Sequence, residues 1–164
     1  MTLSQEQLKQ LSVPERLGRV ARQWQSVADR ELAPLGLTYP RWSAMWKLVR
    51  IGDGASQKQL AEALEIELAS LMRTLTQLEQ QSLVVRRVCP DDGRAKRVYL
   101  TDAGHALVKK MEAKILKVRR TLMADIADED IETVKHVLAI ISRNAHQMCS
   151  EQKKQDDKQG GDAQ

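Results

Sequence analysis

The stretch from residue 56 to residue 100 constrains the fold most, because two short amphipathic helices are followed there directly by a β-hairpin pattern. Ser56 and Gln59 have the spacing of a capping box at the start of the first helix. A break at residues 65–67 then leads into a second helix over residues 68–81. Two short helices joined by a turn of a few residues are the helix-turn-helix arrangement, and we expect that arrangement here.

The residues after the second helix predict a basic β-hairpin. Residues 83–89 are rich in β-branched side chains, and Pro-Asp-Asp-Gly at residues 90–93 is a turn signal. Residues 97–100 supply a second short strand. This part of the chain carries the cationic residues Arg86, Arg87, Arg94, Lys96 and Arg97. A helix-turn-helix followed by a hairpin is the order of elements in a winged helix.

Longer helices are expected on both sides of this segment. Ser12 and Glu15 form another capping box, and apolar residues follow at helical spacing. Thr38 caps a second helix, Thr101 a long helix and Asp128 the last one. Aromatic residues make up only 3% of the chain and Phe is absent, so aliphatic side chains, Ala and Met must form the core. The expected fold class is mainly α, an α+β winged helix with six helices and a small β-hairpin.

Charge and composition limit the classes of function. The net charge of +4 is mildly basic, which permits a nucleic-acid partner without requiring one. Cys89 and Cys149 are far apart in sequence, and His105, His136 and His146 have no metal-ligand spacing. No apolar run approaches the ~20 residues that span a bilayer, and the N-terminus lacks an apolar signal core. We therefore expect a cytoplasmic protein without a membrane partner, metal, cofactor or catalytic residues.

Residues 70–104 resemble the recognition helix, the wing and the start of the following helix in the MarR family. The pattern Arg-Thr-Leu-x-Gln-Leu-Glu and the wing Asp-x-Arg-Ala-Lys-Arg are similar to the SlyA-like branch in particular. The resemblance extends over about residues 12–148. It implies a MarR-type domain over residues 1–149, followed by a tail at 150–164 whose polar composition predicts disorder. Within the domain it implies dimerisation helices at both termini, about 12–35 and 101–149, around a winged helix-turn-helix at about 38–100.

The resemblance also implies that the recognition helix enters a major groove of double-stranded DNA. One face of that helix carries Ser70, Arg73, Thr74 and Gln77 at helical spacing, opposite an inner stripe of leucines. Arginine can pair bidentately with guanine, and the neighbouring side chains are short or neutral hydrogen-bonding groups. We select these residues as candidate base or phosphate contacts. The alternative is that Arg73 is an ordinary solvated charge.

The wing supplies a second set of candidate DNA contacts. In the family pattern an arginine at the position of Arg94 enters the minor groove, and an acid at the position of Asp92 orients it. Arg86, Lys96 and Arg97 are expected to contact phosphates. For all of these cationic residues, the alternative is a solvated loop or strand.

The resemblance to SlyA-like members further implies a pocket for a small aromatic carboxylate. Arg19, Arg22 and Trp42 match positions that line it: arginine offers two donors to a carboxylate and tryptophan a flat apolar wall. Trp46 stands where relatives can carry a histidine, which leaves the ligand preference open. Alternatively, Trp42 belongs to the core, and the arginines bridge two subunits.

The function that we expect from the sequence is sequence-specific transcriptional regulation. A homodimer would bind a pseudo-palindromic operator, modulated by a small aromatic or phenolic anion. Two alternatives stay open. A winged-helix adaptor for other proteins would carry acids on the helix at 68–81 and lack a basic wing. An enzyme acting on phenolic acids would need a catalytic acid–base pair, which no motif in the sequence indicates.

Overall fold

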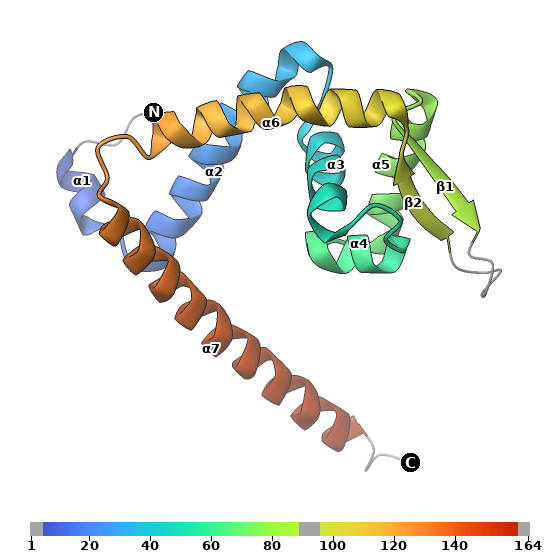
Figure 1. Ribbon diagram of the computed structural model, residues 1–164. Coiled ribbons are helices and arrows are strands. Elements are labelled where there is room, and N and C mark those ends of the chain that lie inside the picture. Colours follow the sequence, from blue (N-terminus) through green and yellow to red (C-terminus); the bar gives the residue numbers. More distant parts are fainter. Residues whose placement is uncertain (1–4, 89–95, 161–164) are drawn as a thin grey trace. The chain divides into compact units, whose positions relative to one another are not determined.

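The structure is a computed structural model that describes residues 5–88 and 96–160. The chain divides into two compact units, Met1–Leu122 and Met123–Gln164, each of which is described by itself. In chain order the helices and strands are α1 (Gln5–Gln10), α2 (Val13–Leu32), a 3-10 turn (Ala33–Leu35), α3 (Tyr39–Ile51), α4 (Gln57–Leu64), α5 (Leu68–Gln80), β1 (Val84–Val88), β2 (Lys96–Leu100), α6 (Asp102–Leu122) and α7 (Asp128–Gly160) (Figure 1).

The predicted fold class is confirmed, and the six predicted helices correspond to α2 to α7. Ser56 and Thr101 cap their helices as predicted, whereas the Thr38 side chain accepts no capping hydrogen bond from the start of α3, and Asp128 is the first residue of α7 rather than its cap. The Ser56 hydroxyl accepts from the Gln59 amide at 3.1 Å, and the Ser56 amide donates to the Gln59 side chain at 2.9 Å. At the start of α6 the Thr101 hydroxyl accepts from the Gly104 amide at 3.0 Å. The short helix α1 was not predicted, because its six residues contain no repeat of apolar positions.

A single aliphatic core holds α3, α4, α5 and the hairpin together. Leu71, Leu75 and Leu78 of α5, the predicted inner stripe, are at most 1% exposed. They belong to one cluster with Met45, Leu48, Leu60, Val84, Val98 and Met111. Between α4 and α5 the chain turns at Glu65, whose φ of 55° is left-handed, and the next amide, Ile66, donates back to Ala61 at 3.1 Å. This turn fixes the direction in which α5 leaves α4.

The hairpin is attached to the loop that precedes α4. β1 and β2 are antiparallel, with Val84 opposite Leu100 and Val88 opposite Lys96. On the other edge of β2, the Gly54 amide donates to the Val98 carbonyl at 2.8 Å, and the Val98 amide donates to Ala55 at 2.9 Å. β2 therefore has hydrogen-bond partners on both edges.

Helix α6 connects the winged-helix part of the first unit to α2. It packs against β2, α3 and α2, beginning beside the hairpin (Figure 1). Near its far end, Lys114 and Lys117 form ion pairs with Glu31 of α2, at 3.8 and 3.3 Å. At its beginning, a Cβ on Gly104 would lie 2.1 Å from the Leu83 carbonyl oxygen, so the close approach requires glycine there.

The second unit consists mainly of α7, whose apolar side chains are exposed. Val134, Leu138 and Ile141 are 56%, 39% and 39% exposed, although they follow the predicted three-four spacing. The helix continues to Gly160, whereas the sequence predicted disorder from residue 150. The polar residues of this segment include Gln, Lys and Glu, which are good helix formers, so their polarity does not stop the helix. No helix in the described part of the chain is long and apolar enough to cross a membrane.

Candidate nucleic-acid interface

The exposed face of α5 is cationic and neutral, without a carboxylate. Arg73, Gln77 and Ser70 are exposed, as the sequence predicted. Within the described part of the chain, the Arg73 guanidinium has no hydrogen-bond or ion-pair partner. The same side of the helix also carries Ala69, Thr76 and Gln80, which sequence reasoning did not select. Such a face offers a positive charge and uncharged hydrogen-bonding groups to an external acceptor.

The placement of Thr74 on this face is wrong. Thr74 is only 8% exposed and lies on the inner side with Leu71, Leu75 and Leu78. It is three residues after Leu71 and four before Leu78, which are the separations that place helical residues on one face. Its hydroxyl is satisfied locally, because it donates to the Ser70 carbonyl at 3.2 Å. Thr74 is therefore part of the core, and its side chain is not available to DNA.

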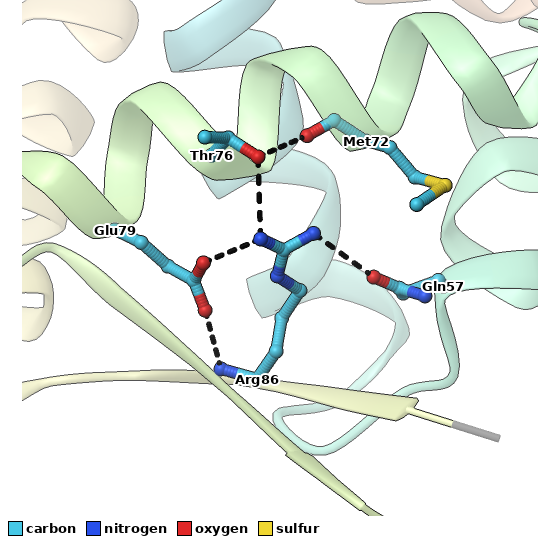
Figure 2. Close-up of polar contacts among 5 residues, drawn as sticks. All are labelled: Gln57, Met72, Thr76, Glu79 and Arg86. Atoms are coloured by element: carbon cyan, nitrogen blue, oxygen red, sulfur yellow. Dashed lines mark hydrogen bonds and ion pairs between the residues drawn. The ribbon is translucent and has the colours of Figure 1, made fainter. Parts of the chain in front are cut away.

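Arg86 also has a different role from the predicted phosphate contact. Its side chain is only 14% exposed and forms an ion pair with Glu79 of α5. The guanidinium donates further to Thr76 at 3.2 Å and to Gln57 of α4 at 3.4 Å, as Figure 2 shows. The Arg86 amide donates to Glu79 at 3.0 Å. Arg86 thus binds strand β1 to α4 and α5, because its guanidinium makes three hydrogen bonds to these two helices.

This network also explains why Glu79 does not make the α5 surface acidic. The hydrogen bond from the Arg86 side chain lowers the pKa of Glu79 below its ordinary value of 4.5, against the opposing effect of partial burial. The carboxylate is ionised, and its charge is paired with a guanidinium. Glu79 is the single acid of α5, so the helix carries no unpaired negative charge toward solvent.

The wing residues fall into two groups. Lys96 and Arg97 on β2 are exposed, as predicted, and the Arg97 guanidinium donates to the Gly54 carbonyl at 2.9 Å. Asp92 and Arg94 lie outside the described residues. On β1, the exposed Arg87 lies over the Tyr99 ring, 5.2 Å from its centroid. That cation–π contact was not predicted, because sequence alone does not reveal the strand register that creates it.

The two arginines proposed for the ligand site do line a common pocket. A pocket of about 320 Å³ near the start of α2 is lined by Leu11, Pro14, Glu15, Gly18, Arg19 and Arg22. The Arg22 guanidinium lies over Gly18, where a Cβ would be 3.2 Å from its nitrogen. The hydrogen bonds from Ser12 lower the pKa of Glu15, which keeps that carboxylate ionised beside the arginines. The pocket therefore combines two positive charges and one negative charge.

The two tryptophans lie elsewhere. Trp42 and Trp46 on α3 are half-buried against the core, and the Trp42 indole donates to the Asp29 carboxylate at 2.7 Å. Asp29 is ten residues beyond Arg19 on α2, which is about 15 Å along the helix. Within one protomer the tryptophans therefore do not line the pocket of the arginines. The predicted single site of arginines and tryptophans is divided into two places.

A second pocket of about 330 Å³ lies at the base of the wing and is lined by Ile51, Gly52, Asp53, Gly54, Ala55, Gln59 and Arg97. Asp53 is already engaged there. It accepts from the Leu100 amide at 2.8 Å and lies 3.4 Å from His105. No group of three His, Cys, Asp or Glu side chains gathers anywhere in residues 5–88 and 96–160 in a way that could hold a metal ion.

Comparison with known proteins places these features in a family. The family model described as "MarR family" matches residues 37–96, which include the helix-turn-helix and strand β1. The crystal structure of the transcriptional regulator PA3341 is 32% identical, with a TM-score of 0.77 over 83% of this chain and 99% of that one.

More distant structures have the same fold. A MarR transcriptional regulator from Methanosarcina mazei Go1 is 22% identical, with a TM-score of 0.74 over 83% of this chain and 97% of that one. The repressor CouR, bound to a 23-mer DNA duplex, is 24% identical, with a TM-score of 0.74 over 87% and 99%. CouR from Rhodococcus jostii RHA1, bound to p-coumaroyl-CoA, is 21% identical, with a TM-score of 0.70 over 79% and 91%.

Proposed function

Because the chain belongs to the MarR family of winged-helix transcriptional regulators, we propose that it binds a specific DNA operator as a homodimer, in the manner of the SlyA-like branch. The observation that carries the proposal is the exposed face of α5. It presents Arg73 and neutral polar side chains, and the acid of this helix is paired with Arg86. A face that lacks an unpaired carboxylate can approach the phosphates of a DNA groove without repulsion.

Arg73 is the residue to which we assign base recognition. Its guanidinium is exposed on α5 and has no partner among the described residues, so it can pair bidentately with a guanine in the major groove. Gln77 lies four residues later, on the same side, and Ser70 lies at the edge of that face. CouR, a repressor of the same fold, has been solved bound to a DNA duplex, which supports DNA as the partner.

The wing is proposed to add backbone contacts. Lys96 and Arg97 are exposed on β2 and can neutralise phosphates. From the sequence pattern alone, we assign to Arg94 a contact in the minor groove and to Asp92 the orientation of its guanidinium. Arg86 is left out of this set because its side chain is largely buried and bonded to Gln57, Thr76 and Glu79 inside the protein.

We propose a homodimer because both units leave apolar side chains uncovered. On α2, Val13, Val20 and Trp24 are 61%, 56% and 37% exposed, and α7 exposes a longer row. Apolar areas of this kind mark interaction surfaces in soluble proteins. The dimerisation segments remain those of the family pattern, about 12–35 and 101–149. Two recognition helices would then read half-sites about one helical turn of DNA apart, ~34 Å, on a pseudo-palindromic operator.

A small aromatic carboxylate is the proposed modulator. Arg19 and Arg22 line one pocket and can hold a carboxylate, and CouR has been crystallised with p-coumaroyl-CoA. Trp42 and Trp46 are assigned instead to the packing of α3. Titration of salicylate into the DNA complex at fixed ionic strength tests the idea. If salicylate releases DNA equally from the wild type and from Arg22→Ala, or if acetate releases DNA as well as salicylate does, the proposed modulator is refuted.

The proposed function is tested by measuring the affinity of the wild-type protein and Arg73→Ala for the DNA upstream of its own gene and for a scrambled duplex. We expect the wild type to prefer the upstream DNA. Arg73→Ala should lose about 1–3 kcal/mol of that preference, the worth of a bidentate base contact, with little change on scrambled DNA. Arg50→Ala, an exposed arginine of α3 outside the proposed DNA contacts and dimerisation segments, is the matched control for lost charge. A wild-type protein that binds both duplexes equally would refute sequence-specific recognition.

A further inference from the structure

Thr76 is exposed on α5, three residues after Arg73, and therefore lies on the same side of the helix. Its hydroxyl already has two partners inside the protein. The hydroxyl donates to the Met72 carbonyl at 2.9 Å and accepts from the Arg86 guanidinium at 3.2 Å. The polar branch of this side chain is therefore engaged, although the residue itself is exposed.

The partner of that hydroxyl is held firmly. Arg86 is paired with Glu79 and hydrogen-bonded to Gln57, so its guanidinium cannot leave Thr76 without breaking contacts to two helices. Figure 2 shows the Thr76 oxygen facing the Met72 carbonyl and the Arg86 guanidinium. Because a threonine χ1 places the hydroxyl and the methyl on different sides of Cβ, fixing the hydroxyl also fixes the methyl group.

We propose that Thr76 is a specificity-determining residue whose methyl group contacts the 5-methyl group of a thymine in the major groove. The proposal rests on the proposed function, in which α5 enters that groove. Thymine is the base that carries a methyl group on its major-groove edge, and threonine methyl groups are among the apolar groups that recognise it. Arg73 would read guanine by charge and hydrogen bonds, while Thr76 reads thymine by apolar contact one helical turn later.

The experiment replaces the thymines of the operator by uracil, one symmetric pair at a time. Uracil lacks only the methyl group, so the change isolates the proposed contact. At one position in each half-site, the wild type should bind uracil about fourfold more weakly, since burial of a methyl-sized group is worth about 0.8 kcal/mol. Thr76→Val, which keeps the methyl group, should retain this discrimination. Thr76→Ser, which keeps the hydroxyl, should bind both duplexes equally at that position.

The following outcomes would overturn the proposal. If Thr76→Ser keeps the wild-type pattern at every position, Thr76 does not read a thymine methyl group. If uracil has no effect but Thr76→Val loses operator affinity, the hydroxyl recognises a base amine through its remaining lone pair. A wild-type protein that fails to prefer operator over scrambled DNA refutes the proposed function and this proposal together. A wild-type preference without a Thr76-dependent uracil effect refutes this proposal alone.

Discussion

At the scale of single residues, the pair of Glu79 and Arg86 has the widest effect, because it joins a strand of the wing to the recognition helix. Both side chains are partly shielded from water, at 30% and 14% exposure, so their attraction is less screened than that of a surface pair. Arg86 also donates a hydrogen bond to the Thr76 hydroxyl on α5. Removal of either side chain would leave the charge of the other partly shielded from water and without its ion-pair partner.

We predict that Glu79→Gln destabilises the protein by about 1.5–3 kcal/mol at neutral pH, the range for a lost hydrogen bond to a charged group. The pKa of Glu79 is lowered in the folded protein from 4.5. Its stabilising effect is therefore complete above that value and disappears as the pH falls through the lower, folded value. The difference in free energy of unfolding between wild type and variant should shrink in the same direction. Urea unfolding from pH 7 downward measures it.

Glu62 supplies the matched control. The Glu62 carboxylate lies 3.9 Å from the Lys58 ammonium group, and both side chains are more than half exposed. Glu62→Gln should therefore change the free energy of unfolding by at most about 0.5 kcal/mol at any pH. Equal and pH-independent effects of the two variants would contradict the assignment of Glu79 as a stabilising ionised partner.

At the scale of elements, local signals were enough to predict most of the fold. Helices α4 and α6 begin where Ser56 and Thr101 provide caps, because such caps satisfy backbone amides locally. Periodicity placed Leu71 and its neighbours correctly but not Thr74, because a polar residue can be buried when it bonds to its own helix. The partners of Arg86 were not predictable either, since they depend on how β1 folds back onto α5.

Gly104 tests the contact between α6 and the turn before β1. A Cβ at this position would lie 2.1 Å from the Leu83 carbonyl oxygen, which is part of the backbone and cannot rotate away. Gly104→Ala should therefore destabilise the protein by about 2 kcal/mol or more, as overpacking does. Thermal or urea unfolding measures the change.

Gly18, near the start of α2, is the comparison. The nearest atom to an added Cβ there is the end of the Arg22 side chain, at 3.2 Å, which can move. Because alanine is the better helix former by up to about 1 kcal/mol, Gly18→Ala should be neutral or stabilising. If both glycine variants destabilise equally, the close approach of α6 to Leu83 is not the cause.

At the scale of the whole molecule, the proposed homodimer accounts for the exposed apolar residues of α7. We predict that light scattering at micromolar concentration gives twice the mass of 18.5 kDa. Leu138→Glu should shift the protein toward the monomer, because it places a charge in the apolar row. His136→Glu, at a helical position away from that row, should leave the mass unchanged. A wild-type monomer would contradict the proposed dimer.

The brace at Arg86 has a consequence for the spacing of the DNA target. Because Arg86 of β1 is bonded to Glu79 and Thr76 of α5 and to Gln57 of α4, we expect the strand and the recognition helix to move together. Their two footprints must then keep a constant separation along the duplex. One extra base pair between the core of a half-site and its flank, about 3.4 Å, should weaken binding as much as deletion of the flank. Glu79→Ala, which loosens the joint, should tolerate the insertion better, and equal penalties in the two proteins would show that the wing moves independently.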